Sequence, residues 1–179
     1  AGPVHACTYV VVFSYGEIDC RCHAAKFKDD VEMLSMPYAA TIRAYVDSFV
    51  NAFDGARVVP IVLAVPPATD QGYNPAAPFI GALPDRVAAT DLLNASLEVA
   101  CMKHELAFTG AYTWSFAKSE NGALRRDMSD GHVHIRPGLC DSVLQCMRQL
   151  VCDKIESQAA LAPNVQAVHS GTTSIAADL

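Results

Sequence analysis

The sequence predicts an α/β fold, a three-layer α/β/α sandwich around a mostly parallel sheet. Strand-like and helix-like segments alternate along the chain, which is typical of parallel sheets. The strand-like runs are apolar at nearly every position, so helices should cover both faces of the sheet. The composition allows such a core, because 51% of the 179 residues are hydrophobic and only 18% are charged.

The first strand and helix are expected within residues 8–55. Thr8–Ser14 (TYVVVFS) is a β-branched and aromatic run that predicts a strand buried on both faces, with Gly16 as the turn at its carboxyl end. A helix should begin at Ser35 as its N-cap, with Pro37 in its first turn, because apolar residues then recur every three or four positions. Gly55 should end this helix.

The second strand and helix follow directly. Residues 58–65 (VVPIVLAV) predict another buried strand, which Pro66 and Pro67 end because proline cannot continue a ladder. Residues 68–83 are rich in Pro and Gly and predict a long loop at a strand's carboxyl end, where functional loops tend to lie. Pro84 should open a helix that continues to about His104.

The last part of the chain predicts one more strand and one more helix. Residues 106–114 (LAFTGAYTW) fit a strand, and the polar residues 118–130 contain a turn at 120–122. The last helix should begin after Pro137. Residues 157–179 show little periodicity, so we expect one domain over residues 1–156 and a C-terminal tail over residues 157–179.

Charge and cysteine content exclude some functions. The formal net charge is -6 and the 13 Lys and Arg residues are spread thinly, so no nucleic-acid partner is expected. No apolar run approaches the roughly 20 residues that cross a bilayer, so the protein should be soluble and not membrane-spanning.

Seven cysteines cannot all pair within one chain, which favours a reducing intracellular or organellar compartment. The first residue is Ala1, so we expect a processed N-terminus or a preceding segment.

Two segments at the predicted carboxyl edge of the sheet carry the chemically active residues, and ligands bind at this edge in such folds. Residues 16–23 (GEIDCRCH) combine two acids with Arg21 and His23. Residues 129–134 (SDGHVH) place Asp130 shortly before two histidines. A carboxylate that orients an imidazole is what acyl-transfer chemistry needs, because the imidazole then takes a proton from a nucleophile.

These motifs resemble those of the SGNH (GDSL) hydrolases. The family pattern is a strand that ends in G-x-x-D, an Asn-containing helix, and D-G-x-x-H before a terminal helix. GEIDCRCH with SDGHVHI is similar to a particular branch, as are VPP, PFIG and the Arg86-Val87 and Leu93-Asn94 pairs, so the resemblance covers residues 9–150. It implies a flavodoxin-like sheet and the hydrolysis of esters, often acyl groups on sugars.

The resemblance also implies roles for individual residues. Asp130 and His134 would be the acid and the base of a triad, with His132 as a rival because the spacing here is one residue longer than the common D-x-x-H. The oxyanion and substrate-binding positions would be Gly16, Asp19, Arg21 and His23.

The chain departs from the family pattern at two decisive places. Ile18 stands where the family has an Asn, so this side chain offers no hydrogen-bond donor. The nucleophilic Ser of the family lies in a G-D-S motif on an earlier strand, and only AGPVHAC precedes the first strand here. Without that strand, the edge from Tyr9 to Phe13 should be apolar and unpaired, and should need a protein partner or another part of the polypeptide to cover it.

These departures favour a non-catalytic structural or interaction subunit of a larger assembly. The alternative is an ester hydrolase, whose serine lies on an upstream segment and whose ligand is a small ester or a glycan. A third hypothesis is a small-molecule binding module that uses residues 16–23 and 66–83. The sequence predicts no cofactor.

Simpler explanations exist for each candidate residue. Asp130 and His134 could form a solvated surface turn, and Arg21 could pair with Glu17 and Asp19 in an ion-pair cluster. Trp114 and Tyr112 could stack on a sugar, although aromatic residues at a strand end are usually core. A zinc site is disfavoured because C-x-C lacks the usual ligand spacing; its ligands would come from Cys20, Cys22, His23, His132 and His134. No metal is therefore predicted.

Overall fold

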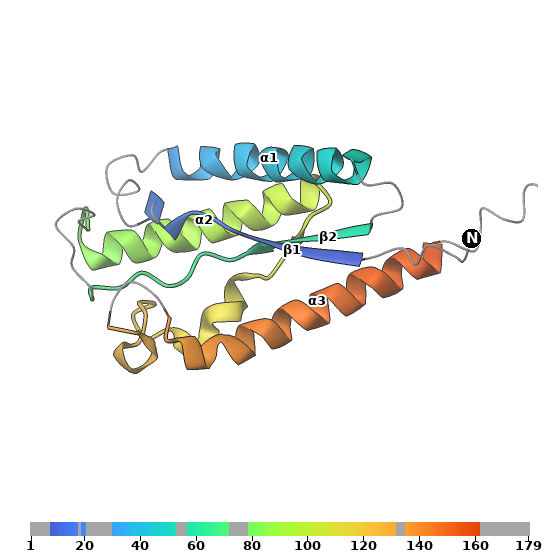
Figure 1. Ribbon diagram of the computed structural model, residues 1–179. Coiled ribbons are helices and arrows are strands. Elements are labelled where there is room, and N and C mark those ends of the chain that lie inside the picture. The colour runs from blue at the N-terminus through green and yellow to red at the C-terminus, as the bar shows by residue number, and fades with distance from the viewer. Residues whose placement is uncertain are drawn as a thin grey trace, which may run out of the picture.

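The computed structural model has three layers, with a parallel sheet between helices (Figure 1). This confirms the predicted α/β class. The sheet order is β1-β2-β3, and both neighbouring pairs are parallel. The residues that the structure describes are 8–17, 19–20, 30–52, 57–71, 79–131 and 135–161.

The sheet is built on β2 (Arg57–Leu63), which pairs with β1 (Thr8–Ser14) along its full length. The register places Thr8 opposite Arg57 and Ser14 opposite Leu63. On its other side, β2 pairs only with the short strand β3 (Ala107–Phe108). The described part of the sheet therefore has β1 at one edge, with β2 as its central strand.

Three long helices cover the two faces of this sheet. Helices α1 (Val31–Ala52) and α2 (Leu83–Lys103) lie on one face, and α3 (Cys140–Leu161) lies on the other (Figure 1). Short 3-10 helices connect β3 to α3; they are η3 (Ala111–Ala117), η4 (Arg126–Met128) and η5 (Pro137–Leu139). No helix in the described part of the chain is long and apolar enough to cross a membrane.

Alternate residues of β2 point into two separate cores. Val62 packs with Ile42 and Val46 of α1, whereas Ile61 packs in a cluster that Met147 and Leu150 of α3 join from the other side. This alternation follows from the pleat of a strand, which points successive side chains to opposite faces. The uniformly apolar sequence of β2 is explained by this burial on both faces.

The prediction that β1 is buried on both faces is wrong. Its residues are exposed or half-buried, and Tyr9, Val10 and Val12 remain 44%, 46% and 44% exposed. The reason is its position, because an edge strand has a neighbour on one side only and the helices are centred over β2 and β3. An apolar run alone does not distinguish a central strand from an uncovered edge.

Two predicted boundaries also differ. The strand expected over residues 106–114 stops at Phe108, because Gly110 adopts a φ of 79° and the chain then winds into η3. Helix α1 begins at Val31 rather than at Ser35, so Ser35 and Pro37 lie inside it, and Ser35 is buried. Gly55, its expected end, lies outside the described residues.

Helix α3 follows Pro137 through η5, and its Val143 is buried against the sheet as the periodicity predicts. It continues through Ser157 to Leu161, so the first residues of the expected tail belong to this helix. The predicted turn at residues 120–122 is confirmed, because Gly122 has a φ of 80° between the bridged residues Lys118 and Leu124.

Candidate functional site

The turn that follows β1 is fixed by Gly16. This residue has a φ of 90°, and a Cβ built on it would lie 2.7 Å from Leu93 Cδ2 and 2.9 Å from Val65 Cγ2. Glycine alone fits both the backbone angle and the close approach of α2. The Cys20 N–H donates to the Gly16 carbonyl at 2.9 Å, so a hydrogen bond joins the two ends of this turn.

Asp19 in this turn is held by α1. The hydroxyl of Tyr38 donates to Asp19 Oδ2 at 2.5 Å, and the Tyr38 ring lies 5.5 Å from that of Tyr15. Burial and this hydrogen bond to a carboxylate raise the pKa of Tyr38, so Tyr38 remains a donor at neutral pH. Asp19 was expected to help bind an oxyanion or substrate, and here one of its oxygens accepts a hydrogen bond from the protein itself.

Cys20 is a core residue rather than a nucleophile. It packs with Val65, Leu93 and Leu97, and burial raises the pKa of its thiol to about 11. Because the thiolate is the reactive form, a thiol with this pKa is almost entirely unreactive at neutral pH.

A line of buried polar residues on α2 holds the loop after β2. Arg86, Thr90 and Asn94 are four residues apart and lie on the same side of the helix. Asn94 makes two hydrogen bonds to Val65, accepting from its N–H at 2.7 Å and donating to its carbonyl at 3.0 Å. Asn94 therefore takes the place of a neighbouring strand where β2 leaves the sheet.

Arg86 holds the same loop further along. Its guanidinium donates to the Thr69 carbonyl at 2.9 Å and to the Gly81 carbonyl at 2.7 Å, and it lies 4.6 Å from the centre of the Phe79 ring. Burial lowers its pKa. No role for Arg86 or Asn94 was predicted. Their place among the apolar residues of the buried side of α2 is a sequence signal that could have indicated one.

A small cavity lies between the two loops. Its volume for a water-sized sphere is about 20 Å³, which is room for about one water molecule and too little for a substrate. Four polar or charged residues are among those that line it: Glu17, Thr69, Arg86 and Thr90.

The residues after β3 are structural. The Trp114 indole N–H donates to the Ala64 carbonyl at 2.7 Å, and Trp114 is buried with Val143 of α3. Thr109 Oγ1 accepts a hydrogen bond from the Ala64 N–H at 2.9 Å. Of the two explanations for Trp114, the core position is therefore the correct one and a sugar platform is not.

Asp130 lies on a loop whose two ends are fixed. Ser129 is buried, its hydroxyl accepts from the Gly131 N–H at 3.0 Å, and it pairs with Ile135 in an antiparallel bridge. Asp130 itself is exposed. The segment that carries it lies at the end of the molecule where β1 and β2 end, as predicted (Figure 1).

The structure describes only part of the predicted site. Gly16, Asp19 and Asp130 are described, whereas four predicted positions lie outside the described residues: Arg21, His23, His132 and His134. The described residues contain no group of three His, Cys, Asp or Glu side chains that could hold a metal ion.

A wider, open groove lies beside this edge, with a volume of about 630 Å³. Two exposed ion pairs lie in it, because Arg125 pairs with Asp127 at 2.6 Å and Arg126 with Asp70 at 3.4 Å. Glu120 adds a further negative charge to the lining, so the groove offers no excess of positive charge for an anionic ligand.

No protein-family model matches the sequence, and no curated protein matches it. The structure is similar to that of phospholipase A1 from Streptomyces albidoflavus NA297, with a TM-score of 0.44 and 18% sequence identity over 83% of this chain and 71% of that chain. A likeness at this level carries no argument about activity.

Proposed function

We propose that this chain is an SGNH-hydrolase-like domain with a non-catalytic role, and that it binds another polypeptide along the outer edge of β1. One observation carries the proposal: β1 is an apolar strand that, among the described residues, pairs only with β2. In the described part of the chain no residue pairs with the outer side of β1, and this is the position that β-strand addition uses.

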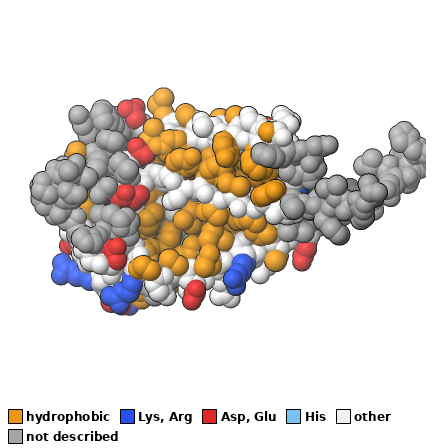
Figure 2. Space-filling view, in the orientation of Figure 1, with side chains coloured by type: hydrophobic (Ala, Val, Ile, Leu, Met, Phe, Trp, Pro, Cys, Tyr) orange, Lys and Arg blue, Asp and Glu red, His pale blue; other side chains and the backbone are white. Residues whose placement is uncertain are grey.

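The side chains around this edge favour a polypeptide partner. Figure 2 shows two bands of hydrophobic side chains with a pale strip between them, and this strip follows the path of β1 in Figure 1. Polar backbone flanked by apolar side chains matches an extended apolar strand, which supplies hydrogen bonds and apolar contact together. Covering each half-exposed valine would contribute about 1 kcal/mol.

A photo-crosslinking experiment in the protein's own cells tests this function. A benzoyl-phenylalanine in place of Tyr9, which is half-exposed on β1, should form a covalent adduct with a polypeptide. The matched control is the same group in place of Met102, which is exposed on α2 and should form none. Equal adduct formation at both positions, or none at either, would contradict the proposal.

Ester hydrolysis is the second candidate function. The observation that favours it is the bridge between Ser129 and Ile135, which fixes both ends of the loop carrying Asp130 and His134. In this proposal Asp130 orients His134, and His134 acts as general base and then as general acid. The serine would come from a segment that precedes this chain, backbone N–H groups near Gly16 would bind the oxyanion, and the substrate would be a small acyl ester.

Hydrolysis of p-nitrophenyl acetate separates the two histidines. His134→Ala should lower turnover by orders of magnitude, because the general base is lost, while His132→Ala should retain most of it. The assay needs the polypeptide that includes the serine. Turnover that survives both substitutions would rule out this triad.

A further inference from the structure

The sequence of β1 has the same chemical order in both directions. Thr8 and Ser14 are hydroxyl residues at its two ends, Tyr9 and Phe13 are aromatic, and residues 10–12 are all valine. Val11 is the centre of this order. A strand of this kind matches itself when two copies run antiparallel, because each residue then meets its own chemical type.

We propose that the polypeptide covering β1 is a second copy of this chain, paired antiparallel about a two-fold axis at Val11. The inference rests on the proposed interaction function and names its partner. In this register Tyr9 lies opposite the partner's Phe13, Val10 opposite the partner's Val12, and Val11 opposite its own counterpart. The pairing joins the two three-stranded sheets into one.

The antiparallel arrangement also closes the assembly. A two-fold interface uses the same surface on both subunits and ends with a dimer. An apolar edge strand that stays unpaired can aggregate with the edges of other molecules. Lys, Glu or Pro in an edge strand would prevent this, and β1 contains none of them. Aromatic and β-branched cross-strand pairs are among those that stabilise antiparallel strands.

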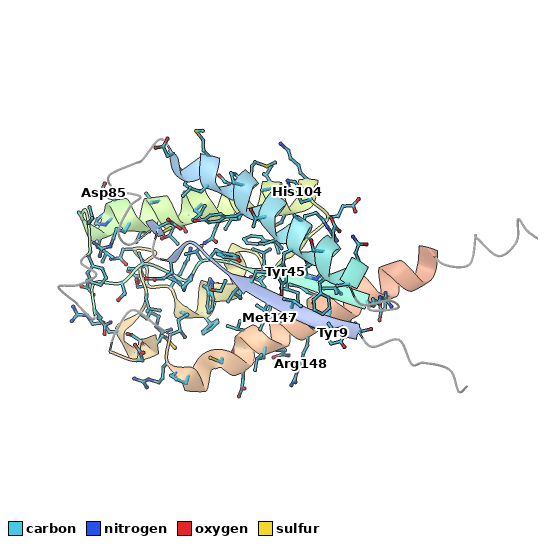
Figure 3. The ribbon with its side chains drawn as sticks, turned by 45° about the horizontal axis from the view of Figure 1, so that its top comes forward. Tyr9, Tyr45, Asp85, His104, Met147 and Arg148 are labelled. Atoms are coloured by element: carbon cyan, nitrogen blue, oxygen red, sulfur yellow. The ribbon has the colours of Figure 1, made fainter. Side chains whose placement is uncertain are left out.

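The side chains that flank β1 suit this contact. On the α1 side, Tyr45 is 55% exposed and packs edge-on against Phe13 of β1, and Tyr9 of β1 packs edge-on against Phe49. Figure 3 shows Tyr45 on α1 near β1, which carries Tyr9. None of the seven residues of β1 is charged, so pairing of two copies along this strand buries no charge from the strand itself.

Disulfide formation at the axis tests the register in the 179-residue chain. Opposed residues in antiparallel strands have Cα atoms about 4.5–5.5 Å apart, which is within disulfide range. Val11→Cys should therefore give a linked 11–11 peptide on oxidation, identified by mass spectrometry so that native cysteines do not interfere. Thr8→Cys is the matched control, because its copies would be roughly 20 Å apart.

Sedimentation velocity tests the dimer itself. The unmodified chain should sediment as a dimer, and Val10→Lys/Val12→Lys should sediment as a monomer with an unchanged circular dichroism spectrum, since both valines are half-exposed. A monomeric unmodified chain would overturn the second-copy inference. If the Tyr9 position then cross-links to a different polypeptide, the interaction function stands; if it cross-links to nothing, both proposals fail. Equal disulfide yields from Val11→Cys and Thr8→Cys would overturn the register.

Discussion

Gly16 is the residue on which the turn out of β1 depends. Replacement by alanine would force a Cβ to within 3 Å of both Leu93 and Val65, in addition to the strain of a positive φ. We expect Gly16→Ala to lower the free energy of unfolding by on the order of 1–3 kcal/mol or more, measured by urea titration with circular dichroism.

Gly131 provides a matched control for this prediction. It has the same φ of 90°, but a Cβ added there would meet nothing within 4 Å. Gly131→Ala should therefore show the backbone strain without the overlap, and its loss of stability should be smaller. Equal losses at the two positions would mean that the close approach of α2 is not what selects glycine at position 16.

The buried thiol of Cys20 predicts a dependence of stability on pH. The ordinary pKa of 9.0 is raised to about 11 by burial, so the unfolded chain loses the proton first as the pH rises. The protonated Cys20 thiol therefore makes its full contribution to the free energy of unfolding below pH 9. This contribution is lost as the pH rises to about 11, and the loss is at most about 3 kcal/mol.

Cys101 has a pKa raised to about 11 by the same cause, so it shares this dependence. Cys20→Ala should reduce the fall in unfolding free energy between pH 9 and pH 11, measured by urea titration at each pH. Cys140→Ala, at an exposed position, should leave the fall unchanged. An unchanged fall in Cys20→Ala would show that this thiol ionises as readily in the folded chain as in the unfolded chain.

At the scale of elements, the polar line on α2 fixes the loop after β2. Asn94→Ala would leave the buried N–H and carbonyl of Val65 without their partner, which costs about 1–3 kcal/mol for each group. We therefore expect a loss of about 2–6 kcal/mol of stability in urea titration. Glu98→Ala, on the exposed side of the same helix, should cost little; a similar loss in both would contradict this role.

The bounds of an element can be predicted from the sequence where its buried residues follow one regular pattern. Both strand β2 and helix α2 lie within a few residues of their expected bounds, because β2 is buried on both faces and α2 follows a helical repeat. The end of the third strand could not be predicted. The strand ends before Gly110, which has a positive φ. This conformation goes with the hydrogen bonds that Thr109 and Trp114 make to Ala64, which are tertiary contacts. Tertiary contacts overrode the local β propensity there.

The edge of the sheet at which the predicted loops lie follows from the sequence, whereas the contacts within these loops do not. Strand–helix alternation brings the carboxyl ends of parallel strands to one edge, and the turn with Gly16 follows β1 directly. That Gly16 and Asp130 belong to one site stays a prediction. The hydrogen bond from Tyr38 to Asp19 could not be predicted, because it joins residues from two elements whose packing sets the distance. The helical spacing of Arg86 and Asn94 puts both on one side of α2, but their partners in the loop after β2 depend on tertiary packing and could not be predicted.

At the scale of the whole molecule, α3 is the long helix on its face of the sheet. Met147 on α3 packs in two core clusters, one with Ile61 and one with Ala64, so it joins this helix to β2 and to the loop that follows it. Met147→Ala should lower the free energy of unfolding by about 2 kcal/mol, measured by urea titration. Figure 3 shows Met147 beside the sheet and Arg148 on the far side of the helix.

Arg148→Ala is the control for this prediction. Its side chain is exposed on α3, so its loss should change stability by less than about 0.5 kcal/mol. If both substitutions have the same small effect, α3 does not depend on Met147 for its attachment to the sheet.

The hydrogen bond from Trp114 to Ala64 gives the protein an internal optical probe. Trp114 is the single tryptophan in the chain, and it is buried where the end of β2, η3 and α3 meet. Its ultraviolet emission therefore reports on one junction, not on an average over the molecule. Light emitted at longer wavelengths would mark the moment at which water reaches this junction, and would show whether α3 separates before the sheet itself comes apart.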